Sequence, residues 1–311
     1  MIVTVTMNPA IDKTIEVENL EIGNLNRIKS SVFDVGGKGI NVSKTINAIG
    51  GQSIATGFIG GSTGNLIQTT LEKLGISTDF VQVNGETRTN TKVFTNNYPV
   101  TELNEIGEEI TQEQLEELIK KIVSYAKADT LFVLAGSIPA GVPVDVYKTI
   151  TEKVHEKGSK VILDADGELF KVSILAKPDV IKPNRDELAR YASIEGQITQ
   201  RQLIDITSEF FDAGISTVVV SMGKEGASFF DRAHSLKCDP MDVPVLSTVG
   251  AGDAMVAGLA YSIDKNLEFE EMIKLSMATS NGAVTTHGTK PPSKELVEEL
   301  KPLARISMIY K

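Results

Sequence analysis

The chain contains very little cysteine and histidine and no tryptophan. Cys238 is the only cysteine among the 311 residues, so no disulfide can form within the chain, and we expect a cytoplasmic protein. The three histidines, at positions 155, 234 and 287, are scattered and lack the spacing of metal ligands. The sequence therefore excludes a disulfide scaffold and disfavours a histidine–cysteine metal centre.

Long apolar runs and an excess of basic charge are lacking as well. No run approaches the roughly 18 apolar residues that a membrane-spanning helix needs. Residues 1–6 predict a strand and not the basic and apolar start of a signal peptide. The chain carries 41 acidic and 31 basic residues, a net charge of −10. Neither nucleic acid nor an anionic membrane is therefore expected as a partner, although a locally basic pocket for an anionic metabolite remains compatible.

The dominant pattern is an alternation of short apolar runs with amphipathic segments. Strands are predicted at residues 2–6, 54–59, 130–134, 160–164, 180–182 and 217–221, and helices between them at residues 42–49, 64–74, 112–125 and 144–156. Strands that alternate with helices predict an α/β fold with a mostly parallel central sheet and helices on both faces.

Two segments depart from this order. Residues 14–35 and 80–93 alternate polar and apolar side chains, which predicts antiparallel strands in a separate small sheet. We expect one α/β domain over residues 1–311, with the lid strands inserted at about 12–35 and 79–104. Such a sheet would serve as a lid over a site, and its exposed face would form a homodimer contact.

The most informative segment is Thr248 to Asp253. Gly250, Ala251 and Gly252 lead into an acid and an apolar run, which predicts a loop that enters a helix. Free N–H groups at a helix start form an anion site. Asp253 would either stabilise the helix start or act as a general base beside a bound phosphate.

A second glycine loop surrounds Lys38, between Gly37 and Asn41. It predicts a turn into a helix, with or without a ligand on its backbone N–H groups. Its spacing fits neither a P-loop nor the dinucleotide fingerprint, which disfavours a nicotinamide dehydrogenase. Asp12 follows the first strand, where it would be either a ligand-binding carboxylate or a cap.

Asn184 and Glu187 follow a later strand and lie one helical turn apart. This spacing suits Mg²⁺, directly or through its waters, and suits a capping box equally well. The turn from Ser221 to Gly226 would approach a phosphate or form only a hairpin. The cations Arg27, Lys38 and Arg88 would each be surface charges alone, but together they would hold one phosphate.

These motifs together resemble the PfkB (ribokinase-like) carbohydrate kinases. Residues 36–42 and 248–253 are similar to the two signatures of that family, and Asn184-x-x-Glu187 is similar to its Mg²⁺-associated motif. The resemblance runs from residue 1 to about residue 292. Residues 6–12 and Lys38 resemble the branch of 1-phosphofructokinases and tagatose-6-phosphate kinases. Ser247 stands where much of the family has Asp, which puts a monovalent-cation site in doubt.

The resemblance implies a role for each matching residue. Asp253 would take the proton from the sugar hydroxyl, while Gly250, Ala251 and Gly252 would hold the transferring phosphoryl group. The sugar phosphate would contact Asp12, Gly37, Asn41, Lys38, Arg27, Arg88 and Ser137. ATP would contact Lys182, Asn184, Ser221, Gly223, Gly226, Thr248, Gly250, Gly252 and Asn281, and Glu187 with Asn184 would hold Mg²⁺ through water.

The implied activity is ATP-dependent phosphorylation of a ketohexose monophosphate. The first expectation is a 1-phosphofructokinase, which converts fructose 1-phosphate to fructose 1,6-bisphosphate. The second is a tagatose-6-phosphate kinase, which makes tagatose 1,6-bisphosphate. A non-catalytic sugar-phosphate sensor on the same fold is the remote alternative, disfavoured because Asp253 and Glu187 are both present. ATP and Mg²⁺ are the implied cofactors, and a K⁺ requirement stays open.

Overall fold

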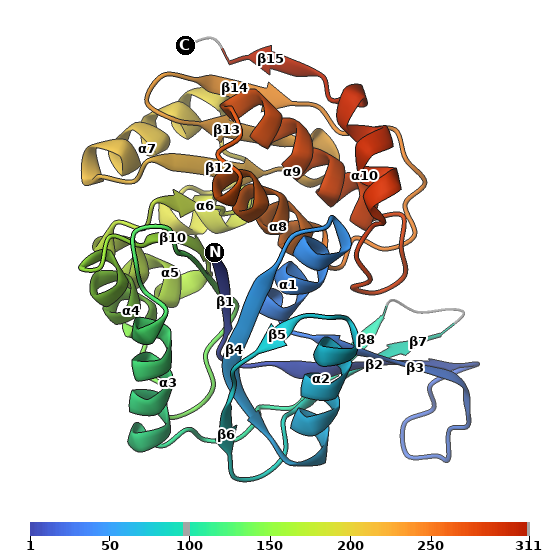
Figure 1. The fold of residues 1–311 in the computed structure, drawn as a ribbon. Coiled ribbons are helices and arrows are strands. Elements are labelled where there is room, and N and C mark those ends of the chain that lie inside the picture. The colour runs from blue at the N-terminus through green and yellow to red at the C-terminus, as the bar shows by residue number, and fades with distance from the viewer. Residues whose placement is uncertain (96–99, 310–311) are drawn as a thin grey trace.

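A computed structural model describes residues 1–95 and 100–309. Eleven strands form the main sheet, in the order β15-β14-β13-β12-β11-β10-β9-β1-β4-β5, with β6 paired to β4. Their bounds are β1 Ile2–Thr6, β4 Ser53–Gly60, β5 Ser77–Thr78, β6 Val81–Val83, β9 Leu131–Ala135, β10 Lys160–Asp164, β11 Val180–Ile181, β12 Thr217–Ser221, β13 Ala227–Phe230, β14 Ser235–Cys238 and β15 Ile306–Met308. The sheet is parallel from β5 to β12 and antiparallel from β12 to β15 (Figure 1). The predicted α/β architecture is confirmed.

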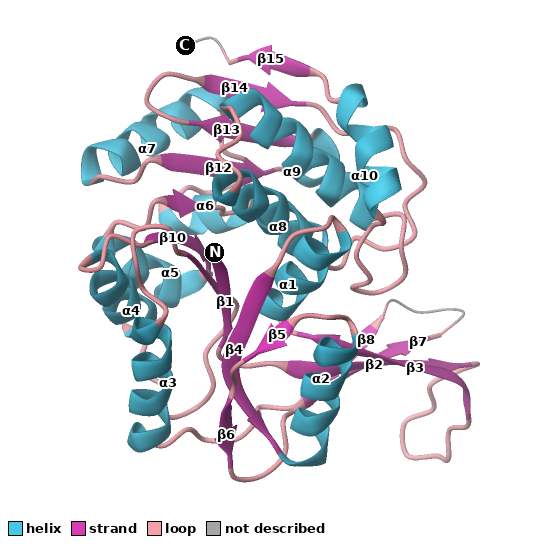
Figure 2. Cartoon of the chain, viewed as in Figure 1, coloured by secondary structure: helices cyan, strands magenta, loops and turns pink. Residues whose placement is uncertain are grey.

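Helices cover both faces of this sheet (Figure 2). One face packs against α1 Lys38–Ala48, α8 Ala251–Asp264, α9 Phe269–Ala283 and α10 Lys294–Leu300. The other packs against α3 Gln112–Ser124, α4 Val146–His155, α5 Gly167–Ser173, α6 Arg185–Tyr191 and α7 Gln200–Ala213. A third apolar cluster joins α2 Gly61–Lys73 to β4, α1 and the small sheet. No helix among residues 1–95 and 100–309 is long and apolar enough to cross a membrane.

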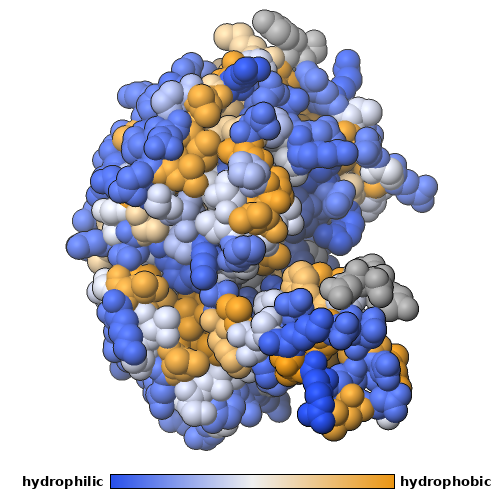
Figure 3. All heavy atoms as spheres, turned by 90° about the vertical axis from the view of Figure 1, so that its right-hand side faces the viewer, coloured by the Kyte–Doolittle hydropathy of each residue, from blue (hydrophilic) through white to orange (hydrophobic). Residues whose placement is uncertain are grey.

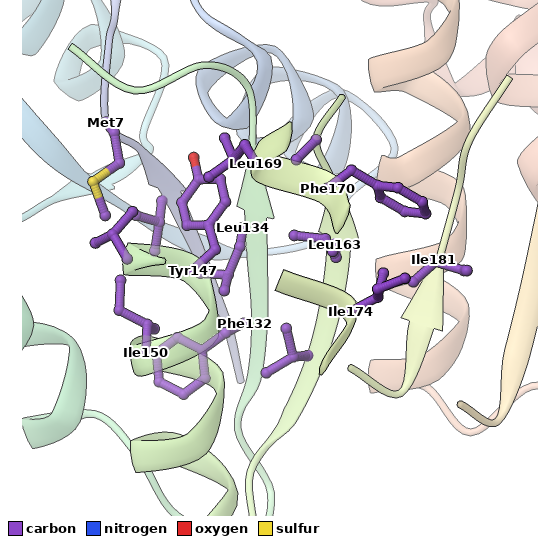
Figure 4. Packing of buried hydrophobic residues seen from close by; sticks show 14 of the residues in the cluster. Met7, Phe132, Leu134, Tyr147, Ile150, Leu163, Leu169, Phe170, Ile174 and Ile181 are labelled. Carbon is purple, nitrogen blue, oxygen red and sulfur yellow. The ribbon is translucent and has the colours of Figure 1, made fainter. Parts of the chain in front are cut away.

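The alternation of side chains along β9 shows how the two layers are built. Leu131 and Val133 enter the cluster under α8 and α9, whereas Phe132 and Leu134 enter the cluster under α4 and α5. Figure 4 shows this second cluster, in which Tyr147 packs beside Leu134. The Tyr147 hydroxyl lies 3.2 Å from the Ala135 carbonyl oxygen, to which it donates a hydrogen bond at the end of β9. Burial of each such side chain stabilises the fold by about 1.5–3 kcal/mol. This packing therefore fixes the position of the end of β9.

The lid is a separate four-stranded sheet that protrudes from the body (Figure 1). Its strands are β2 Ala10–Val17, β3 Ile28–Gly36, β7 Thr89–Phe94 and β8 Thr101–Asn104, in the order β3-β2-β7-β8. The predicted antiparallel pairing is confirmed for β2 with β3 and for β7 with β8, but two details of the prediction were wrong. Strands β2 and β7 pair in parallel, and residues 81–83 pair with β4 in the main sheet. Alternation reports which face is buried, but it does not specify the partner strand.

The predicted ends of strands agree best with the structure where polar residues flank a short apolar run. Strands β1, β10 and β12 coincide with the predicted residues. Helix α1 begins at Lys38, four residues before the prediction, because the glycine-containing segment is already helical. The glycine loop is therefore the first turn of a helix, and its backbone N–H groups face outward from the helix start.

Candidate active site

The carboxyl ends of three neighbouring strands place polar residues along one edge of the main sheet. Asp164 ends β10, Lys182 follows β11, and Ser221 ends β12. Asn184 forms an isolated bridge with Ser221, which draws the loops after β11 and β12 together. Open α/β sheets bind ligands at this edge, so the fold indicates a ligand-binding site there.

Helix α8 starts at the same edge and carries Asp253 in its first turn. Gly250 caps the helix with φ 81°, a left-handed conformation that favours glycine. Asp253 is buried, at 8% exposure, and its Oδ2 accepts a hydrogen bond of 2.8 Å from Asn41 Nδ2. The two signature motifs, one on α1 and one on α8, thus meet directly through these side chains.

The Asp253 carboxyl has an unusual proton affinity. Burial, and secondly the negative charge of Asp164, raise its pKa to about 6, against the lowering effects of Asn41, Lys38 and Lys182. A carboxylate whose pKa lies close to neutrality is a stronger base than an exposed aspartate and is still ionised at pH 7. The arrangement suits a general base.

Asp164 holds two lysines at the centre of the site. Its Oδ1 lies 3.2 Å from Lys38 Nζ and 3.5 Å from Lys182 Nζ. Burial would raise the pKa of Asp164, but Lys182 and Lys38 hold it below its usual value. For Lys38, the effect of burial is outweighed by Asp164, Asp253 and Glu187, so its pKa is raised. Both lysines also act electrostatically on Asp253, so an anion bound here would lie between two ammonium groups.

Asp164 was not among the residues singled out from the sequence. Its position at the end of the apolar run 160–164 was the available signal, because ligand-binding side chains follow strand ends in this architecture. The sequence prediction assigned Lys38 to the phosphate on the sugar. The structure places Lys38 on Asp164 and within the influence of Asp253 and Glu187, so we propose a role for it near the phosphoryl group in transit.

The inner end of the lid presents Asp12 over the glycine loop. A Cβ at Gly36 would lie 2.7 Å from Asp12 Oδ2, so a side chain there would displace the carboxylate. Asp12 Oδ1 accepts a 3.3 Å hydrogen bond from Asn90 Nδ2 on β7. Asn90 Oδ1 is buried and has no hydrogen-bond partner among the residues the structure describes. Asn90, which the sequence reasoning missed, thus offers an acceptor to a ligand hydroxyl beside Asp12.

Arg88 lies next to Asp12 and Asn90. Its Nη2 donates to the Asn8 carbonyl oxygen at 3.1 Å, and its Nε is buried without a partner in the described part of the chain. Burial lowers the pKa of Arg88, while Asp12 opposes that effect. A partly buried guanidinium with an unused donor is suited to bind an anionic group of a ligand.

The other two candidates for the sugar phosphate lie in different parts of the structure. Arg27 precedes β3 at the outer end of the lid, and a strand rising ~3.3 Å per residue places it roughly 30 Å from Gly36 within one chain. Ser137 follows β9 at the functional edge and is exposed. Arg88 is therefore the remaining cation beside Asp12 that we propose for this phosphate.

Asn184 and Glu187 form a capping box at the start of α6. Asn184 Oδ1 accepts from Glu187 N at 2.8 Å, and Glu187 Oε2 accepts from Asn184 N at 2.7 Å. No group of three metal-binding side chains occurs within residues 1–95 and 100–309. One carboxylate at this edge still fits Mg²⁺, which is commonly bound by one or two carboxylates, waters and substrate phosphates. Both interpretations of the motif are thus compatible with the structure.

The remaining residues predicted for the nucleotide surround the β12–β13 turn and α8. Gly223 is exposed, whereas a Cβ at Gly226 would lie only 2.1 Å from the Cys238 carbonyl oxygen, which explains the glycine there. Thr248 is exposed in the loop before α8. Asn281 accepts from Met241 N and donates to the Met277 carbonyl oxygen. Its amide therefore holds the loop at Met241, which is a structural contribution to this edge.

Comparison with known proteins identifies the family of this chain. Residues 5–296 match the model of the pfkB family carbohydrate kinases. A 1-phosphofructokinase of Bacillus subtilis (strain 168) is 34% identical over 310 residues, covering 99% of this chain and 100% of that protein. A D-tagatose-1-phosphate kinase of Bacillus licheniformis is 33% identical over 294 residues, covering 94% of this chain and 96% of that protein. The crystal structure of Escherichia coli phosphofructokinase-2 in complex with potassium superimposes with a TM-score of 0.90 at 26% identity, covering 97% of this chain and 98% of that one. The chain belongs to the pfkB family of carbohydrate kinases.

Proposed function

We propose that this protein transfers a phosphoryl group from ATP to a hydroxyl of a ketohexose monophosphate, with fructose 1-phosphate as the first substrate and fructose 1,6-bisphosphate as the product. The single observation that carries the reaction type is the buried Asp253 at the N-terminus of α8, held by Asn41. The substrate follows from full-length similarity to 1-phosphofructokinases.

In the proposed mechanism, Asp253 acts as the base. It takes the proton of the sugar hydroxyl while the oxygen attacks the terminal phosphorus of ATP, and the bond from that phosphorus to the ADP oxygen breaks. The pKa of about 6 leaves Asp253 ionised at neutral pH, and protonation at lower pH would stop the reaction. The first N–H groups of α8 would stabilise the developing negative charge, because they have no partner within the helix.

Lys38 and Lys182 would neutralise the transferring phosphate, since Asp164 fixes both ammonium groups at this centre. Glu187 and Asn184 are the residues that would hold Mg²⁺, through water, beside the ATP phosphates. Bound Mg²⁺ supplies charge neutralisation and orientation of the phosphates. A K⁺ requirement is proposed only from the potassium complex of the Escherichia coli relative, and Ser247 gives no side-chain charge for it.

The substrate is tested by ADP release across fructose 1-phosphate, fructose 6-phosphate, tagatose 1-phosphate, tagatose 6-phosphate and the free sugars. Fructose 1-phosphate should give the highest kcat/KM, and free fructose should be a poor substrate because Arg88 then has no phosphate to bind. The highest kcat/KM for a free sugar would contradict the proposal.

A tagatose phosphate is the second candidate, and a specific observation favours it. The Bacillus licheniformis relative is named for tagatose 1-phosphate, which carries its phosphate on C1 like fructose 1-phosphate. We therefore propose tagatose 1-phosphate as the alternative substrate, whereas the sequence prediction named tagatose 6-phosphate. The same assay distinguishes fructose 1-phosphate, tagatose 1-phosphate and tagatose 6-phosphate as substrates.

Replacing Asp164 by asparagine should weaken the site and change its pH dependence in a defined direction. Asp164 raises the pKa of Asp253, so its neutral variant should lower that pKa below about 6. The acid limb of kcat/KM, which needs ionised Asp253, should therefore move to lower pH while the pH-independent value falls. A pH profile measured at saturating Mg²⁺ checks this, and an acid limb that moves upward would contradict it.

We also propose a homodimer through the lid. Apolar side chains are exposed on its strands β3, β7 and β8, at Ile28, Val32, Phe33, Phe94 and Leu103, and Figure 3 shows hydrophobic patches over this protruding part. Phe33→Asp should convert a dimer to a monomer in light scattering, because it buries a charge in the contact. The matched change Leu175→Asp, at an exposed apolar residue outside the lid, should not. A wild-type monomer at working concentration would remove the proposal.

A further inference from the structure

Lys44 is a buried lysine that none of the roles above uses. It lies on α1, one turn after Asn41, and is 6% exposed. Its ammonium donates to three acceptors: the Val35 carbonyl oxygen at 2.7 Å, Asn41 Oδ1 at 3.2 Å and Thr289 Oγ1 at 3.2 Å. A lysine ammonium has three N–H donors, so every donor of Lys44 is engaged.

The contact to Asn41 continues to the proposed base. An ammonium group cannot accept a hydrogen bond, so the Asn41 amide must turn its oxygen toward Lys44. Its nitrogen then faces Asp253 Oδ2, to which it donates at 2.8 Å. The three side chains form one buried chain of hydrogen bonds, in which Lys44 determines the orientation of the amide beside the carboxylate.

The other two contacts hold Lys44 in place from separate parts of the chain. Val35 lies near the inner end of lid strand β3. Thr289 lies in the loop before α10 and packs against the start of α8, where its Cα is 3.5 Å from the Cβ position of Gly250. The ammonium thus joins the lid, the glycine loop and the turn that caps α8.

The electrostatic surroundings show that this position is costly for a lysine. Burial lowers the pKa of Lys44 to about 8, although Asp34 on β3, Asp12 on β2 and Asp253 on α8 oppose the effect. No carboxylate of the described residues lies within ion-pair distance of its Nζ. An apolar side chain would fill the same space without desolvating a charge. A purely structural role therefore does not account well for a lysine here.

We propose that Lys44 is a positioning residue for phosphoryl transfer: it orients the Asn41 amide so that Asn41 holds Asp253 in place as the base. This inference rests on the proposed role of Asp253. All three N–H donors of Lys44 are engaged by protein acceptors, so we assign it no contact with either substrate. Its removal should therefore affect the chemical step and the proton affinity of Asp253 more than the binding of ATP.

The test compares pH–rate profiles of the full-length protein and Lys44→Met. In metal sites, removal of a partner that orients a functional side chain costs on the order of 10- to 100-fold in activity, and we expect a loss of kcat in that range. The acid limb of kcat/KM should move to higher pH, because the Asn41 hydrogen bond lowers the pKa of Asp253 and the variant also removes the positive charge of Lys44, which interacts with Asp253. The other charged groups facing Asp253, namely Asp164, Lys38 and Lys182, are unchanged in this variant.

Two further variants serve as controls. Lys44→Arg keeps the charge and the donors and should restore part of kcat and the position of the acid limb. Lys290 and Lys44 both line a groove between β3, α1 and α2, but Lys290 makes no hydrogen bond to Asn41. The pH–rate profile of Lys290→Met should therefore match that of the wild type. If Lys44→Met does not fold, Lys44→Gln replaces it, with the same upward movement of the acid limb expected.

The outcomes separate this inference from the proposed function. An unmoved acid limb in a folded, less active Lys44→Met protein would overturn the positioning role, provided that Asp253→Asn is inactive. Full activity of Asp253→Asn would instead overturn the proposed base and with it this inference. In an Asn41→Ala background, Lys44→Met should move the acid limb much less than it does alone; an equal movement would also overturn the role of Asn41 as the intermediary.

Discussion

Replacement of Asp253 by asparagine should lower kcat by roughly 10²–10⁴-fold, the usual contribution of a positioned general base. Asparagine has nearly the same shape, and its side-chain oxygen can still accept the 2.8 Å hydrogen bond from Asn41. It cannot take a proton, so the chemical step should fail while the site keeps its form. Steady-state kinetics at saturating substrates, with ATP binding measured by calorimetry, checks both parts.

The matched control is Asp205→Asn, which neutralises an exposed carboxylate on α7 on the opposite face of the sheet. It should leave kcat unchanged. Turnover of Asp253→Asn within a few-fold of the wild type would refute the assignment of the base. Loss of ATP binding in the same variant would show that Asp253 contributes to the structure of the anion site.

Replacement of Arg88 by alanine should raise KM for the sugar phosphate about 10- to 100-fold, since hydrogen bonds to a charged group contribute roughly 1.5–3 kcal/mol and each 1.4 kcal/mol is a factor of ten. Arg88 has a buried, unused Nε and lies beside Asp12 on the lid side of the site. KM for ATP should change by less than about threefold, because we place the nucleotide at the other side, by β12.

Lys38→Ala provides the contrast within the site. Lys38 is held by Asp164 and acts on Asp253 and Glu187, so its loss should lower kcat more than it raises KM for the sugar phosphate. Arg201→Ala, at an exposed position of α7, is the control for loss of positive charge. Equal increases of KM for ATP and for the sugar phosphate in Arg88→Ala would count against its role.

The sequence indicated the parts of the site whose chemistry is local. Glycine at a helix start, an acid in the first turn and an Asn-x-x-Glu pair are each contained in a few consecutive residues. Gly250, Asp253 and Glu187 were therefore found at their strand and helix ends. The apolar runs indicated the central strands for the same reason, since burial of both faces produces a continuous run.

Asp164, Asn90 and Lys44 could not be recognised in this way, because their environments come from distant parts of the chain. Asp164 meets Lys38 across 126 positions, and Lys44 meets Thr289 across 245. Arg27, in contrast, was proposed from the sequence but lies away from the site. Its charge suggested that it binds the sugar phosphate, but the length of β3 places it at the outer end of the lid. Pairing of the lid strands was likewise set by tertiary contacts and not by the alternation of side chains.

The most direct test of the central claim is phosphorus NMR of the product formed from ATP and fructose 1-phosphate. The wild-type protein with Mg²⁺ should form fructose 1,6-bisphosphate and ADP in equal amounts, and Asp253→Asn should form neither at a comparable rate. Release of inorganic phosphate without the bisphosphate, or equal formation of the bisphosphate by both proteins, would contradict the account.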